Sequence, residues 1–185
     1  MNKVIGIIAG SLRRESFSKK IAMALVPMAP VGYTFQLVSI DDLPLYNQDF
    51  DDHGPLPPAY HRFREEIKAL DGVIFVTPEH NRSIPAALKN AIDIASRPKE
   101  KNAWNGKPGA VFSNSPGNIS AFGANHHLRQ CLVFLNVPVM QQPEVYLAHV
   151  NNLLDEHGAL RDEQTKTFLQ KAIDAYIDWH RKLTA

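Results

Sequence analysis

The sequence predicts an α/β fold in which helices cover both faces of a parallel, doubly wound sheet. Three observations predict it. Runs that are apolar at nearly every position alternate with amphipathic segments, and such runs are typical of strands buried on both faces. Repeated strand–helix units favour parallel strands joined by right-handed crossovers. A length of 185 residues, 44% hydrophobic and 21% charged, suits a single domain over residues 1–185.

The first half of the chain is expected to hold three strands and two helices. The strands share a short apolar or alternating pattern bounded by turn residues: residues 4–8, 34–40 and 72–77. Gly10 follows the first strand, and Pro78 stops the third. The helices share apolar residues three or four positions apart: residues 17–28 and 63–70. Pro27 and Pro30 end the first of these helices.

The second half continues the same alternation. Its helices are expected over residues 88–95, over residues 128–135 and from Asp162 to the end of the chain. Pro98 ends the first of these. A fourth strand is expected at residues 110–112, and a short fifth strand begins at residues 137–139.

One segment, residues 41–58, breaks this rhythm. It carries five Asp and four Pro over 18 residues, and a loop that long in a compact domain is usually functional or disordered. It leaves Tyr46 and Phe50 with no regular element to bury them. We expect these two aromatic residues to cover the site of a neighbouring subunit, or else to fill a surface groove of their own chain.

Composition excludes several classes of protein. A formal net charge of +1 predicts no general affinity for nucleic acid or an anionic membrane. The single cysteine, Cys131, cannot form an intramolecular disulfide and favours a reducing compartment, so a cytoplasmic protein is expected. The leading apolar run is too short for a spanning helix and is followed by charged residues, which argues against a signal peptide.

The loop after the first strand is a candidate phosphate site. Residues 10–18 (GSLRRESFS) bring an early glycine, hydroxyls and Arg13 to the start of a helix. Backbone N–H groups, serine hydroxyls and the positive end of a helix dipole together bind phosphate. The loop has neither the Walker A sequence nor the dinucleotide-binding glycine pattern, so a single phosphate fits best. An ordinary helix cap with solvated arginines explains the loop equally well.

Two further loops follow the third and fourth strands. Residues 77–85 (TPEHNRSIP) hold polar side chains between two prolines, which predicts a rigid ledge; the plain alternative is a capped turn. Residues 113–120 (SNSPGNIS) offer small polar groups and a glycine for close backbone approach, although a simple turn accounts for them as well. In open α/β sheets, ligands bind beyond the carboxyl ends of the strands, where these loops lie.

Together these motifs resemble the NADPH-dependent FMN reductase family, especially its bacterial quinone/chromate reductases and azoreductase-like members. The likeness runs in order along nearly the whole chain: SLR at 11–13 with SF at 16–17, PEHN at 78–81, SIPAALKNAID at 83–93, HLRQ at 127–130, LVFL at 132–135 and PE at 143–144. It implies a flavodoxin-like, five-stranded sheet of order 2-1-3-4-5 that holds FMN noncovalently.

The resemblance also implies roles for particular residues. The FMN phosphate would be bound by the first loop, through Ser11, Arg13, Ser16, Phe17 and Ser18. The isoalloxazine would be lined by the ledge, through Pro78, Glu79, His80 and Asn81. Its pyrimidine end would lie near the third loop, with Ser113, Ser115 and Gly117. Family members are commonly dimers or tetramers, and Arg129 and Glu144 resemble residues that make contacts between subunits.

The chain departs from the family pattern at three places. Ser18 stands where Asn is usual, and His80 stands where Tyr is usual. Ser120 and Ala121 occupy positions where a Gly-Gly pair is common, so the third loop is expected to sit differently. These departures bear on flavin affinity and substrate range.

The expected function is therefore transfer of hydride from NADPH or NADH through bound FMN to a small acceptor, such as a quinone, an azo compound, chromate or free flavin. FMN carries the difficult chemistry, so no catalytic side chain is required. Arg13 and Arg82 are expected to attract the nicotinamide cofactor, with Tyr46 and Phe50 in its vicinity. The alternative is a flavodoxin-type electron carrier, which the near-zero net charge disfavours. A metal site and a nucleophilic Cys131 are not expected, since the histidines are poorly spaced and the cysteine lies on an apolar helix stripe.

Overall fold

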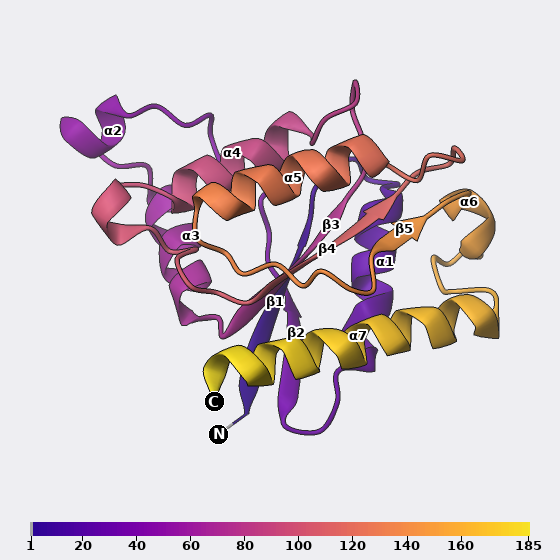
Figure 1. The fold of residues 1–185 in the computed structure, drawn as a ribbon. Helices are drawn as coiled ribbons and strands as arrows, with labels where there is room; N and C mark the ends of the chain where they lie inside the picture. Colours follow the sequence, from indigo (N-terminus) through magenta and orange to yellow (C-terminus); the bar gives the residue numbers. More distant parts are fainter. Residues whose placement is uncertain (1) are drawn as a thin grey trace.

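A parallel five-stranded sheet forms the centre of the molecule in the computed structural model, which describes residues 2–185 (Figure 1). The strands are β1 (Lys3–Ala9), β2 (Tyr33–Leu37), β3 (Gly72–Thr77), β4 (Gly109–Asn114) and β5 (Val145–Leu147). Their spatial order is β2-β1-β3-β4-β5, and every neighbouring pair is parallel. This confirms the predicted flavodoxin-like order and places the switch point between β1 and β3.

Helices cover both faces of the sheet. The longer ones are α1 (Phe17–Leu25), α3 (Pro58–Ala69), α4 (Ala86–Ala95), α5 (Phe122–Phe134) and α7 (Glu163–Thr184). The shorter ones are α2 (Asp49–Asp52) and α6 (Val150–Leu153), with 3-10 turns at Val26–Met28 and Lys99–Lys101. Helices α3, α4 and α5 pack on one face, and α1 and α7 pack on the other.

The strands are apolar throughout because they feed two separate cores. Val73 and Phe75 of β3 point into the core shared with α3, α4 and α5. Ile74 and Val76, their neighbours in the sequence, point into the core shared with α1 and α7. Alternate side chains of a strand face opposite sides of a sheet, so a sheet covered twice needs apolar residues at both sets of positions.

The predicted fifth strand lies in the wrong place. Residues 137–139 form only an isolated bridge, between Val139 and Gly109, and the strand beside β4 is Val145–Leu147. Pro138 has no N–H to donate to a ladder, and its carbonyl is used by Gly109 N at 3.0 Å. A three-residue strand is too short to produce a recognisable periodic pattern.

The second predicted strand and two predicted helices also differ at their ends. Helix α3 begins at Pro58, five residues before the predicted start at residue 63. Strand β2 ends at Leu37, three residues before the predicted end. Helix α5 begins at Phe122, six residues before the predicted start, because its first turn lies against the ledge and carries few apolar residues. Residues 41–58 contain the short helix α2, which the sequence pattern did not indicate. Trp104 and Trp179 are packing residues, as expected, and their indole N–H groups donate to backbone carbonyls of Ile92 and Pro138.

Candidate functional site

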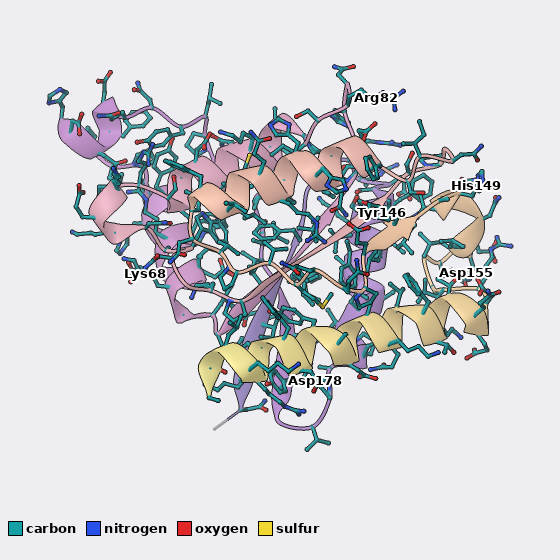
Figure 2. The ribbon with its side chains drawn as sticks, viewed as in Figure 1. Lys68, Arg82, Tyr146, His149, Asp155 and Asp178 are labelled. Atoms are coloured by element: carbon teal, nitrogen blue, oxygen red, sulfur yellow. The ribbon has the colours of Figure 1, made fainter. Side chains whose placement is uncertain are left out.

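Three loops meet at the carboxyl ends of the strands: residues 10–18 after β1, residues 77–85 after β3 (the ledge), and residues 115–121 after β4. The two chain termini lie at the other end of the sheet (Figure 1). Figure 2 shows Arg82 and His149 at the loop end of the molecule. The site therefore forms where parallel strands of an open sheet deliver polar residues together.

The first loop presents free donors at the start of α1. Ser16 caps the helix, and its Oγ accepts a hydrogen bond from Lys19 N at 3.2 Å. Within the described residues, the backbone N–H groups of Phe17 and Ser18, the first two of the helix, have no acceptor. The first N–H groups of a helix always lack partners within the helix. These N–H groups, with the positive end of the helix dipole, can bind an anion.

The side chain of Asn114, the last residue of β4, joins the first loop to the ends of β3 and β4. Its Nδ2 donates to Ser18 Oγ at 2.9 Å and lies 3.4 Å from Thr77 O. Ser18 and Asn114 are both almost completely buried, so this pair fixes the start of α1 against the end of β4. The expected set of site residues did not include Asn114. The available signal was its place at the end of an apolar strand, between two serines.

The ledge ends in a tight reversal of the chain. His80 and Ser83 exchange two backbone hydrogen bonds of 2.9 Å each, and the two residues between them, Asn81 and Arg82, have φ angles of 50° and 65°. Positive φ at both central positions is the conformation of a type I′ turn, which normally favours Asn and Gly. The predicted ledge is thus a strained turn that is closed by two backbone hydrogen bonds.

A cavity between the three loops gathers most of the predicted cofactor residues. Its lining consists of Ser11, Arg13, Ser16, Phe17, Ser18, Pro78, Glu79, His80, Asn114, Ser115 and Pro116. Three serine hydroxyls of the first loop and the Arg13 guanidinium lie beside the free N–H groups at the start of α1. The donor set suits a phosphate monoester, which needs several N–H or O–H donors and a cation.

Three predicted residues lie outside the lining of this cavity. Ser113 is fully buried within β4, where its hydroxyl donates to Ser120 O at 2.9 Å and accepts from Asn125 Nδ2 at 3.1 Å. Asn81 is exposed at the tip of the ledge. Gly117 donates its N–H to Ser115 Oγ at 3.0 Å and so shapes the third loop.

The long segment 41–58 packs on its own chain. Tyr46 stacks on Tyr60 with ring centroids 6.0 Å apart, and Phe50 meets the same ring edge-on at 5.9 Å. Helix α2 lies on the far side of the molecule from the ledge (Figure 1). Within one chain, the structure therefore does not bring Tyr46 and Phe50 to the cavity beside Arg82.

Arg129 and Glu144 both make contacts within the chain. Arg129 donates from Nε to Asn125 Oδ1 at 2.8 Å and from Nη1 to Met140 O at 2.9 Å. Burial lowers the pKa of the Arg129 guanidinium. Glu144 accepts from Tyr146 OH at 2.9 Å, and burial together with this carboxylate raises the pKa of Tyr146 to about 12.

The structure also describes the metal-ligating side chains, the single thiol and the apolar character of the helices. Residues 2–185 do not bring three His, Cys, Asp or Glu side chains together in a group that would hold a metal ion. Cys131 is partly buried beside the core, and burial raises the pKa of its thiol. Among the described helices, none has the combination of length and apolar character needed to cross a membrane.

Comparison with known proteins bears on the same site. Residues 3–152 match the family described as NADPH-dependent FMN reductase. The chain is 52% identical over 175 residues to a quinone reductase of Pseudomonas putida, covering 95% of this chain and 93% of the relative. It is 43% identical over 177 residues to a 2-hydroxy-1,4-benzoquinone reductase of Burkholderia sp, covering 96% of each. Among solved structures, the flavoenzyme NAD(P)H:(acceptor) oxidoreductase FerB of Paracoccus denitrificans superimposes with a TM-score of 0.89 at 38% identity, covering 97% of this chain and 98% of FerB.

Proposed function

Because this chain belongs to the NADPH-dependent FMN reductase family, it is an FMN-dependent NAD(P)H oxidoreductase, and we propose that its acceptor is a quinone. The single observation that carries the choice of acceptor is the strong, nearly full-length similarity to two relatives named for quinone reduction. The cavity lined by the first loop and the ledge supplies the place where the cofactor would be held.

The phosphate of FMN is assigned to the first loop. Ser11, Arg13, Ser16 and Ser18 line the cavity there, and Phe17 begins the helix whose first N–H groups are free. Charge-assisted hydrogen bonds from a guanidinium and from helix N–H groups are the contacts that phosphate prefers.

The flavin ring is assigned to the ledge and the third loop. Pro78, Glu79 and His80 line the cavity from the ledge, with Asn81 beyond them, and Ser115 lines it from the third loop. Gly117 and Ser113 would act from behind that loop by fixing its shape. Preorganised N–H groups around such a ring stabilise negative charge that develops on it.

When bound, FMN supplies the chemistry, because it accepts a hydride from NAD(P)H and passes the electrons on in a second half-reaction. The protein's own residues then have three tasks: binding, orientation and the control of charge. Arg13 and Arg82 add positive charge near the mouth of the site, which favours the approach of a phosphorylated nicotinamide cofactor.

A second copy of the chain is proposed to complete the site. Tyr46 and Phe50 lie away from their own cavity, so they would serve a neighbouring subunit, with Arg129 and Glu144 at a contact between subunits. Light scattering coupled to gel filtration tests this proposal, which predicts a homodimer or homotetramer; a monomeric peak at micromolar concentration would contradict it. The cytoplasm is the proposed location, in keeping with the single free cysteine.

The decisive experiment is a turnover assay with the purified, FMN-loaded protein. NADPH or NADH is consumed in the presence of a benzoquinone, an azo dye, chromate or free FMN, each at the same concentration. The proposal predicts the highest kcat/KM with the benzoquinone. Preference for another acceptor would reject the quinone assignment, and no consumption of NAD(P)H by the isolated protein would favour the flavodoxin-type carrier.

A further inference from the structure

The ledge is fastened to the N-terminus of α5 by the side chain of Glu79. Its Oε2 accepts a hydrogen bond from Ala124 N at 3.0 Å, and its Oε1 lies 3.4 Å from Arg82 Nη1. Helix α5 has Ala121 at its N-cap position and no side-chain cap of its own. The carboxylate of a distant loop therefore takes the place of a capping residue and also meets the positive end of the helix dipole.

A second fastening lies one turn further along the same helix. The hydroxyl of Ser83, at the end of the ledge turn, is 2.6 Å from His127 Nδ1. Ser83 is also the residue whose backbone closes the turn on His80. The imidazole of His127 therefore reaches the point where the strained turn returns to α4.

Gly123 makes this close approach possible. A Cβ at this position would lie 3.0 Å from Glu79 Oε2 and 3.0 Å from Arg82 O. Both distances are shorter than ordinary contacts of carbon with oxygen, and Arg82 O belongs to the backbone of the ledge. A glycine within the first turn of a helix costs helix stability, so its presence here fits a requirement for room.

We propose that Glu79 and His127 are positioning residues that fasten the ledge to the N-terminal turn of α5 and so set the wall against which FMN binds. The ledge needs such support because Asn81 and Arg82 both have left-handed backbone conformations. Non-glycine residues keep such conformations only where their surroundings hold them in place. The claim that Glu79 and His127 hold the ledge rests on their contacts alone. The claim that the held ledge forms the wall for FMN rests on the proposed function.

The claim that the ledge is held is tested on the FMN-free protein by amide hydrogen exchange. The amides of His80 and Ser83 are hydrogen-bonded to each other's carbonyls, so their exchange reports on opening of the ledge. His127→Ala should speed exchange at these two amides by about fivefold, the effect of one ordinary hydrogen bond. His126→Ala is the matched control, because the neighbouring imidazole contacts Tyr146 instead of the ledge. Equal exchange in His127→Ala and wild type would overturn the proposal.

The claim that the held ledge forms the wall for FMN is tested by titrating FMN into apoprotein and following the quenching of flavin fluorescence. Ser83→Ala and His127→Ala should each weaken FMN binding by about fivefold, and the double variant should be no weaker than either single one. His127→Asn should recover most of the affinity, because its amide offers a donor and an acceptor near the position of Nδ1. The coupling would be overturned if the fold-loss of FMN affinity in the double variant equalled the product of the two single losses. Full affinity in both single variants would overturn it as well.

Gly123→Ala provides a test that does not depend on removing a contact. Alanine favours the helix. If Gly123 were only an ordinary helix residue, Gly123→Ala should therefore be at least as stable as wild type. If the added methyl group of Gly123→Ala pushes the ledge away from α5, FMN binding should weaken. Glu79→Gln, whose amide oxygen can still accept from Ala124 N, should keep more FMN affinity than Glu79→Ala. Failure of wild-type protein to bind FMN would reject the proposed function itself, whereas normal binding by Gly123→Ala would reject only the positioning role.

Discussion

Among the residues that line the cavity, Arg13 carries the only guanidinium, and its neighbour Arg14 does not line it. Both side chains come from the same exposed loop, so general electrostatic effects should be similar for the two. The local contact with a phosphate is what should distinguish them, since hydrogen bonds between charged groups are about twice as strong as neutral ones.

Arg13→Ala is therefore expected to weaken FMN binding by about 10-fold or more, the effect of losing one charged hydrogen bond. The matched variant Arg14→Ala should change the affinity little, because its side chain is 95% exposed. Equilibrium titration of the apoproteins at two salt concentrations checks this. Equal losses in the two variants would assign the effect to general charge instead of to a phosphate contact.

Arg82 occupies a backbone conformation that suits glycine. Its φ is 65°, and its side chain is 72% exposed, with one weak ion pair to Glu79. Such a conformation costs a residue with a Cβ roughly 1–2 kcal/mol. Glycine avoids this cost, but its greater conformational freedom in the unfolded chain offsets part of the gain in stability.

Arg82→Gly is thus expected to stabilise the protein by about 0.5 kcal/mol, because Asn-Gly is the preferred sequence of a type I′ turn. Arg82→Ala loses the same side chain but keeps the strain, so it should not gain stability. Urea unfolding of the two variants and wild type makes the comparison. A gain in both variants would mean that the arginine side chain, and not the backbone, is unfavourable.

At the scale of elements, the segment 41–58 shows why a loop without periodicity is still ordered. Asp51 on α2 accepts from both terminal nitrogens of Arg64 at 2.6 and 2.8 Å, and Arg64 Nε donates to Ile94 O at 2.9 Å. The Arg64 guanidinium holds the pKa of Asp51 below its usual range. Asn90 accepts from Tyr46 N at 2.7 Å and so ties the preceding residues to α4.

Breaking this pair should release the segment. Arg64→Met keeps a side chain of similar length but leaves the Asp51 carboxylate, whose side chain is only 10% exposed, without its charged partner and with only the Tyr46 hydroxyl as a donor. The expected loss of stability is about 3 kcal/mol, because removing one member strands a buried charge. Arg62→Ala, which breaks more exposed ion pairs on the same helix, should cost less than about 1 kcal/mol. Chemical denaturation gives both values, and similar losses would show that Asp51 is solvated.

The sequence patterns predicted the elements with strong periodicity and missed those without it. The strands β1, β3 and β4 and the long helices were recognisable because each buries a face, and burial requires apolar residues at regular spacing. Helix α2 and strand β5 are held by particular contacts, such as that of Asp51 with Arg64, which residues distant in the sequence provide. No local pattern encodes such partners.

The same distinction applies to the site. Residues of the first loop were predictable because a short polar segment follows a buried strand and begins a helix. The roles of Asn114 and His127 depend on which loops meet at the end of the sheet, so they became visible only in the fold. The departure at Ser120 and Ala121 has a physical meaning: both residues have φ near 60°, which explains why a Gly-Gly pair suits these positions.

At the scale of the whole molecule, the sheet separates a functional end from a structural end. The loops of the candidate site follow the carboxyl ends of the strands, while the last turns of α7 and the start of β1 lie at the opposite end (Figure 1). His180 of α7 is completely buried there, against Tyr33 of β2. Its Nδ1 lies 3.1 Å from Tyr33 OH, and its Nε2 has no hydrogen-bond partner within the described residues.

This arrangement predicts that acid destabilises the fold from the end opposite the site. Burial lowers the pKa of His180 below its ordinary value of 6.5; Asp71 opposes that shift, while Lys3 and Arg181 add to it. The unfolded chain therefore binds the proton more readily than the native one. The contribution to stability is complete above about pH 6.5 and is lost as the pH falls toward the lowered native value.

His180→Gln should remove this contribution to the pH dependence, because glutamine does not titrate and still offers an amide to Tyr33 OH. The free energy of unfolding, measured from pH 7.5 down to pH 5, should fall less steeply in His180→Gln than in wild type. His157→Gln is the control for the loss of a histidine, since that side chain is 82% exposed. If His180→Gln and wild type lose stability in parallel, the proton that destabilises the native state binds elsewhere.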